Sequence, residues 1–280
     1  MERRTVRTRD GVGLSCLIGG TGRPLVMLCG WSQAATIFER QFDDFSTIAT
    51  VFALDTRGHG ESDKPAGGYR IQRLAKDLFD VLEALGLDDY DLLAHSLGVS
   101  VAWSYLDMFG AERSPRRLVL VDEPAALVAR PDWSEDEIAR AGAIIPSLEA
   151  LSGLQQTVLA CDVPETHADL LRGMFTPAIG EVDLLAIAAE NLKFPREYAA
   201  TLIGDNCVQD WRNVIPRISV PTLVFAGEAS QHPMASQQWL AETIPDARLE
   251  VIPADEGGSH FMFYENPRRF NDAVIAFLSA

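Results

Sequence analysis

The sequence predicts an α/β fold in which a mostly parallel central sheet is flanked by helices on both faces. Short continuous apolar runs alternate with segments whose apolar residues recur every three or four positions, the patterns of buried strands and amphipathic helices. Hydrophobic residues make up 47% and charged residues 23% of the chain, which is typical of a globular protein. A length of 280 residues accommodates one such core with an inserted segment.

The chain begins with a predicted hairpin over residues 5–20, where polar and apolar side chains alternate around an Asp-Gly pair. Residues 24–30 and 50–55 are apolar runs typical of strands buried on both faces. Between them, residues 35–45 are expected to form a helix. A further helix is predicted over 71–87, because the apolar residues there share one helical face.

The remaining elements continue this alternation. Four more strands are predicted, at 90–95, 116–123, 222–228 and 247–253. Helices are predicted at 97–110, 234–244 and 265–278.

Residues 124–217 break the alternation, because they contain several helical patterns and no strand pattern. Ligands of such folds bind beyond the carboxyl ends of the strands, so an insertion here can cover a site. The sequence therefore predicts a helical lid inserted after the sixth strand. We divide the chain into a core, residues 1–123 and 218–280, and a helical cap, residues 124–217.

Charge and composition narrow the classes of partner. A formal net charge of −16 repels nucleic acid and acidic membrane surfaces. No apolar run approaches the roughly 18 residues that cross a bilayer, and the arginine-rich N-terminus has no apolar stretch behind it. A cytoplasmic location is therefore expected. Four scattered cysteines predict buried thiols and no metal site: Cys16, Cys29, Cys161 and Cys207.

Ser96 is the candidate nucleophile. It lies between a predicted buried strand and a predicted helix, in the pentapeptide Ala94-His95-Ser96-Leu97-Gly98. This context is that of the nucleophile elbow, written GxSxG, in which a sharp turn raises the serine hydroxyl above the sheet. Alanine replaces the first glycine but is still small enough for the tight turn.

A serine nucleophile needs a base, and His260 is the best candidate. It lies in a glycine-flanked loop between the last strand and the last helix, at the same edge of the sheet as Ser96. The other histidines are predicted in a structural loop, the lid, a surface loop and the strand before Ser96, respectively: His59, His167, His232 and His95. Because neighbours on a strand point to opposite faces, His95 is expected to pack beside the site and support it.

The acid that orients the base is less well defined. Its usual place would follow the strand 222–228, but Ser230 stands where aspartate is expected. Asp122 leaves the preceding strand at the same edge and is the preferred candidate. Glu123 and Glu228 remain alternatives.

Acyl transfer also needs donors for the developing oxyanion. The backbone N–H groups of Leu97 and Trp31 are the candidates, and Gly30 lets the loop of Trp31 bend close to Ser96. Together with Gly30 and His95, three aromatic residues are candidates for substrate binding, although each can equally join the lid to the core: Trp133, Phe175 and Trp211.

These motifs together resemble the α/β-hydrolase family. LCGWSQ is similar to its oxyanion loop, DTRGHGESDKP to the loop after its fourth strand, and AHSLG and GGSHF to its nucleophile and base segments. The resemblance implies a small-molecule substrate with an ester, thioester or lactone bond and no cofactor. Ser96 would attack, His260 would act as base, and Asp122 would hold the imidazole while an acyl-enzyme forms and is hydrolysed.

The position of Asp122 leaves other functions open. Lactone hydrolases and cofactor-free dioxygenases that cleave 3-hydroxy-4-quinolone rings have an acid after the sixth strand. The pairs Gly30-Trp31 and His95-Ser96 are also similar to those dioxygenases, but Leu97 stands where a second histidine is expected. In that alternative His260 would deprotonate the ring hydroxyl and Ser96 would only bind it. A ligand sensor on a hydrolase scaffold is the third alternative.

Overall fold

The computed structural model describes residues 1–280 and contains one eight-stranded sheet. Its order is β1-β2-β4-β3-β5-β6-β7-β8. The β1–β2 and β2–β4 pairs are antiparallel, and all the other pairs are parallel. The strands are β1 Glu2–Arg7, β2 Gly13–Gly20, β3 Arg23–Leu28, β4 Ala49–Leu54, β5 Asp91–His95, β6 Leu118–Val121, β7 Thr222–Gly227 and β8 Ala247–Ile252. The predicted fold class is thus confirmed, with the N-terminal hairpin at one edge of the sheet.

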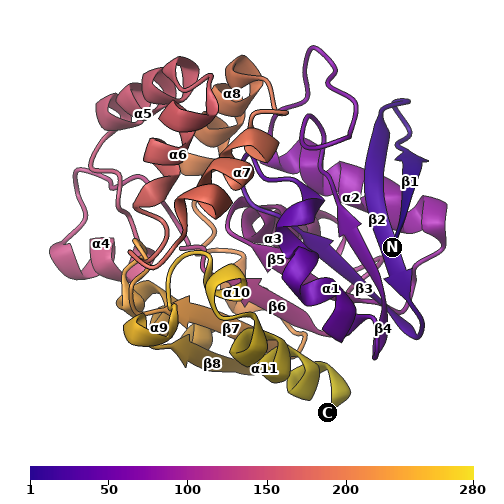
Figure 1. Cartoon of the computed structure of the whole chain (residues 1–280). Helices are drawn as coiled ribbons and strands as arrows, with labels where there is room; N and C mark the ends of the chain where they lie inside the picture. Colours follow the sequence, from indigo (N-terminus) through magenta and orange to yellow (C-terminus); the bar gives the residue numbers. More distant parts are fainter.

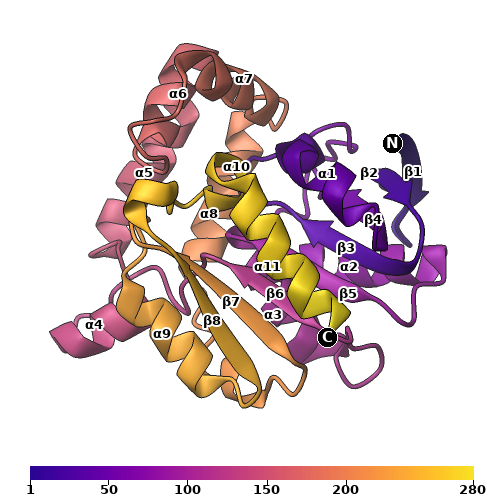
Figure 2. The same cartoon turned by 60° about the horizontal axis from the view of Figure 1, so that its bottom comes forward.

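Helices cover both faces of the sheet. Residues of α2 Ile71–Leu85, α3 Leu97–Phe109 and α9 Met234–Thr243 belong to one hydrophobic cluster. Residues of α1 Glu39–Phe45, α10 Met262–Glu265 and α11 Pro267–Ser279 belong to a second cluster. Figure 2 shows α11 lying across the front of the sheet, with α3 behind it. Two separate cores therefore hold the strands from either side.

Five helices lie between β6 and β7 along the chain, and most of them gather beside one end of the sheet (Figure 1). In this group α5 packs against α8, and α6 against α7, whereas α4 contacts α9 of the core. The helices are α4 Glu135–Ala141, α5 Leu148–Ala160, α6 Pro164–Arg172, α7 Glu181–Asn191 and α8 Arg196–Cys207. That this segment acts as a cap stays a prediction.

No helix of this chain has both the length and the apolar character needed to cross a membrane. The four cysteines are all buried and unbridged.

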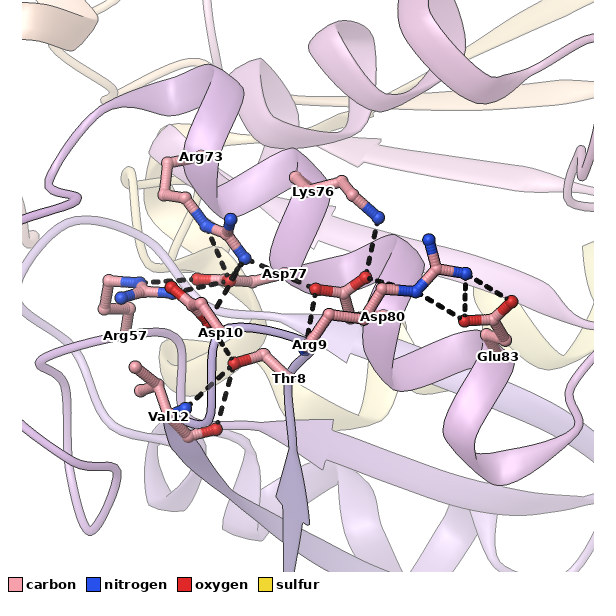
Figure 3. Close-up of polar contacts among 10 residues, drawn as sticks. All are labelled: Thr8, Arg9, Asp10, Val12, Arg57, Arg73, Lys76, Asp77, Asp80 and Glu83. Atoms are coloured by element: carbon pink, nitrogen blue, oxygen red, sulfur yellow. Dashed lines mark hydrogen bonds and ion pairs between the residues drawn. The ribbon is translucent and has the colours of Figure 1, made fainter.

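A network of ion pairs, called the α2 network below, connects the start of the chain to α2 (Figure 3). Its members are Arg9, Asp10, Arg57, Arg73, Lys76, Asp77, Asp80 and Glu83. At its centre Arg57 donates to both carboxylate oxygens of Asp77 at 2.8 Å and to Asp10 at 2.8 Å. Asp10 lies in the turn between β1 and β2, and Arg57 follows β4. The network therefore joins the antiparallel edge of the sheet to the helix that covers it.

Candidate active site

The turn at Ser96 is strained. Ser96 has φ 52° and ψ −131°, a backbone conformation that residues other than glycine rarely adopt and that costs about 1–3 kcal/mol. Its N–H still donates to the carbonyl of Val121 at 2.9 Å, so the ladder between β5 and β6 extends to the residue itself. The next residue, Leu97, begins α3. The strand, the strained residue and the helix thus follow one another without a loop.

Two glycines allow the chain to come this close. A Cβ atom added to Gly98 would lie 2.8 Å from the carbonyl oxygens of Leu28 and Cys29, so any side chain there would push α3 away from β3. A Cβ added to Gly30 would lie 2.9 Å from the Cβ of Ser96. Gly30 is therefore needed for the loop after β3 to approach the serine.

Asp122 is the carboxylate that bonds His260. The Nδ1–H of His260 donates to Oδ2 of Asp122 at 2.6 Å, and the hydroxyl of Ser230 donates to the same oxygen at 2.5 Å. Asp122 also has a positive φ of 52°, while its N–H continues the ladder to the carbonyl of Phe225. Ser96 and Asp122 thus occupy equivalent positions on the neighbouring strands β5 and β6, each at a strained residue directly after the strand.

The two other carboxylates lie elsewhere. Glu228 is exposed and accepts from the backbone N–H of Ala254 at 3.1 Å. Glu123 is buried and accepts from the hydroxyl of Ser100 and the amide of Asn206, each at 3.1 Å. Neither makes a hydrogen bond to His260.

His260 is held through its backbone as well as its ring. Its N–H donates to the carbonyl of Met174, which follows α6, and its carbonyl accepts from Nε2 of His95 at 2.9 Å. The rings of His95 and His260 are 4.6 Å apart. Burial holds the pKa of His95 well below the usual histidine value, so the ring is neutral and serves as a donor to the loop. As expected from the alternation along the strand, His95 lies beside the cavity and supports His260.

Ser96 and His260 line one cavity of about 280 Å³ together with Trp31 and Leu97. The apolar wall of the cavity comes from the inserted segment: Leu127, Ile144, Ile145, Leu154, Leu170, Leu171, Met174 and Ile203. The remaining lining residues are the polar or charged side chains Gln33, Glu123, Asn206, Gln231 and His232, together with Cys207. The cavity thus combines a reactive edge, an apolar wall and a small polar region.

The two predicted oxyanion donors meet the first requirement for that role, an unused N–H group. Leu97 is the first residue of α3, so its N–H has no partner within the helix. The N–H of Trp31 donates to no acceptor in the protein, whereas its indole Nε1 donates to the carbonyl of Ala199 in α8 at 2.8 Å. The indole bond fixes the loop whose backbone would face the oxyanion.

None of the five residues predicted to bind substrate lines this cavity: Gly30, His95, Trp133, Phe175 and Trp211. Phe175 stacks on Phe261 with ring centroids 4.3 Å apart. Trp211 donates its indole N–H to Ser100 at 3.1 Å, and Trp133 lies against the guanidinium of Arg212. Phe175 and Trp211 therefore pack the inserted segment against the core, because this contact removes their large apolar surfaces from water.

The sequence missed His232, which it placed in a surface loop. The structure buries this side chain in the cavity lining, with its ring centroid 5.2 Å from that of His260. Burial lowers the pKa of His232 to about 4, so the ring is neutral near pH 7. The signal that was available is Ser230: a serine at the usual place of the acid marks the loop after β7 as part of the site.

His232, Asp122 and His260 also offer three metal-ligand atoms within 4.8 Å of one another. However, Nδ1 of His260 and Oδ2 of Asp122 already bond each other, and Ser230 holds the same oxygen. The donor set therefore fits an oriented imidazole better than a metal centre.

The family model of the alpha/beta hydrolase family matches residues 25–273. The 3-oxoadipate enol-lactonase 2 of Acinetobacter baylyi is 28% identical over 249 residues, 86% of this chain and 83% of that protein. A putative non-heme chloroperoxidase of Synechocystis sp. is 25% identical over 267 residues, 92% of each chain. The solved structure of an esterase from Exiguobacterium antarcticum covers all of both chains with a TM-score of 0.88 at 24% identity. This chain belongs to the alpha/beta hydrolase family, as its motifs predicted.

Proposed function

We propose that this chain hydrolyses a largely apolar carboxylic ester or lactone of small to medium size through an acyl-enzyme on Ser96. The observation that carries the proposal is the 2.6 Å bond from Nδ1 of His260 to Asp122, at the cavity where Ser96 occupies a strained turn. An imidazole anchored at Nδ1 presents its other nitrogen for proton transfer. Strain in the backbone of a cavity residue is also typical of functional positions.

In this mechanism Nε2 of His260 takes the proton of the Ser96 hydroxyl as the serine attacks the carbonyl carbon. Asp122 stabilises the imidazolium that forms and keeps the ring in the tautomer with hydrogen on Nδ1. The N–H groups of Leu97 and Trp31 would receive the oxyanion. His260 then returns the proton to the leaving alcohol and activates a water molecule that releases the acid.

The relatives support this class of reaction. Family membership and the likeness to an enol-lactonase and an esterase make the chain a hydrolase that acts on ester bonds. The apolar wall contributed by residues 127–203 favours an apolar group on the substrate and assigns the inserted segment the role of a cap. Neither a cofactor-free dioxygenase nor a ligand sensor gains support from these relatives, and we do not propose those functions.

The test uses p-nitrophenyl esters of short fatty acids and a fluorophosphonate probe. We expect a burst of p-nitrophenol followed by turnover, and mass spectrometry should locate the probe on Ser96. The Ser96→Ala variant is the control and should show neither. If the wild-type protein gives no burst, no turnover and no label on Ser96, the proposal is wrong.

A further inference from the structure

Glu123 is a buried carboxylate of the cavity for which the mechanism above has no use. Its side chain is only 3% exposed and lines the same cavity as Ser96. Both of its hydrogen bonds go to one oxygen, Oε1, from the hydroxyl of Ser100 and the amide of Asn206. The other oxygen, Oε2, accepts no hydrogen bond from the protein. Ser100 and Asn206 therefore fix the orientation of the carboxylate and leave one oxygen free.

No lysine or arginine pairs with this carboxylate, and the charge effect of His260 offsets only part of the rise that burial causes in its pKa. The cavity lining contains neither lysine nor arginine, and the His232 ring is neutral near pH 7. Burial raises the pKa of Glu123 to about 7, as expected for a carboxylate held by neutral donors. A buried charge without a partner is costly, so a donor group of a ligand would be stabilised here.

The position of Glu123 places its carboxylate in the same cavity as Ser96 and His260. Glu123 directly follows Asp122, and Ser100 lies in the first turn of α3, which begins after Ser96. Hence a substrate whose carbonyl lies at Ser96 can reach Glu123 with another part of its structure. Asn206 also lines the cavity, and its side-chain oxygen is buried without a hydrogen-bond partner.

We propose that Glu123, oriented by Ser100 and Asn206, binds a hydrogen-bond donor of the substrate, a primary ammonium or hydroxyl group, while the apolar wall holds its hydrocarbon part. This inference rests on the proposed ester hydrolysis and narrows its substrate class. Esters that carry an ammonium or hydroxyl group are favoured over their hydrocarbon counterparts. Esters with a second carboxylate are disfavoured, because that charge would meet Glu123 in a cavity that contains no lysine or arginine.

The first experiment measures binding without turnover. Calorimetric titration at pH 8 compares pentylammonium, 1-pentanol and pentanoate on the wild-type protein, on Glu123→Gln and on Glu228→Gln. Glu228 is the matched control, because it is an exposed glutamate outside the cavity. We expect pentylammonium to bind at least about tenfold more tightly than pentanoate to the wild type, the effect of one hydrogen bond between charged groups. Glu123→Gln should lose this preference, and Glu228→Gln should retain it.

The second experiment uses substrates of matched shape. The ratio of kcat/KM for p-nitrophenyl 6-aminohexanoate to that for p-nitrophenyl heptanoate should fall at least about tenfold in Glu123→Gln but not in Glu228→Gln. An unchanged ratio, or tighter binding of pentanoate than of pentylammonium, overturns the inference. If Glu123→Gln does not fold, the wild-type ranking of the three ligands decides alone.

The two proposals fail separately. Absence of ester hydrolysis together with binding of pentylammonium that depends on Glu123 contradicts the proposed function and supports the subsite. Ester hydrolysis with no preference for pentylammonium overturns the subsite and leaves the hydrolase intact.

Discussion

Buried carboxylates occur in two regions of this molecule, and their partners differ. In the α2 network, Asp77 accepts from the guanidinium groups of Arg57 and Arg73. In the candidate active site, Asp122 accepts from His260 and Ser230, and Glu123 from Ser100 and Asn206. All three carboxylates are at most 3% exposed. Burial is therefore similar in both regions, and the regions differ in the groups that donate hydrogen bonds to the carboxylates.

This difference has a physical consequence. A guanidinium is always charged and holds the carboxylate in place, so the α2 network stabilises structure. Hydroxyl, amide and imidazole donors are neutral or can exchange a proton. The carboxylates that they hold have no permanently charged partner. A developing imidazolium or a bound ligand can therefore supply the positive charge that stabilises them.

The largest expected effect is on the candidate site. Replacing Ser96 with alanine should lower kcat for a p-nitrophenyl ester by about 10⁶-fold, because the nucleophile is lost. Circular dichroism should show an unchanged fold, since removing the hydroxyl does not alter the turn. A residual rate within tenfold of the wild type would mean that Ser96 is not the nucleophile.

Asp122→Asn should lower kcat by about 10⁴-fold, because an amide can hold the imidazole in the wrong tautomer. The substitution keeps the size of the side chain, so the free energy of unfolding measured in urea should change little. Glu228→Gln is the matched control and should retain wild-type kcat. Equal losses in both variants would contradict the role of Asp122.

In the α2 network, the expected effect falls on stability. Arg57→Leu leaves Asp77 buried with only Arg73 as a charged partner and should lower the free energy of unfolding by about 3–5 kcal/mol. Urea denaturation measures this loss, and kcat of the folded protein should be retained. Arg9→Leu removes an exposed pair with Glu83 and a longer contact with Asp80, which keeps Arg73 and Lys76 as partners, so it should have little effect on stability. A drop in kcat as large as that of Asp122→Asn would contradict the separation of the two regions.

The smallest expected effect is a change in how the free energy of unfolding depends on pH when Glu123 is replaced. Because burial raises its pKa to about 7, the native state keeps the proton that the unfolded chain releases near pH 4.5. The contribution of this proton to the free energy of unfolding is complete below about pH 4.5. It is lost as the pH rises to 7, a decrease of about 3 kcal/mol. Relative to the wild type, Glu123→Gln should therefore gain stability between pH 5 and pH 8 in urea denaturation. A constant difference across this range would show that Glu123 does not titrate there.

Local patterns in the sequence predicted the order of strands and helices and the strand-turn-helix context of Ser96. Such patterns depend on residues that are close along the chain, so spacing and glycine placement suffice. The antiparallel edge formed by β1 and β2 was predicted in the same way, from alternation around an Asp-Gly pair. The family membership followed from these elements in their order.

Only the tertiary structure decided which side chains meet at the site. Asp122 and His260 are 138 positions apart, and their bond depends on β6 lying between β5 and β7 in the sheet. The burial of His232, the free oxygen of Glu123 and the exclusion of Trp133, Phe175 and Trp211 from the cavity depend likewise on how distant segments pack. The sequence alone determined the fold and the candidate nucleophile and base, because these depend on local spacing. Packing between distant segments decided the partner of His260 and the contents of the cavity.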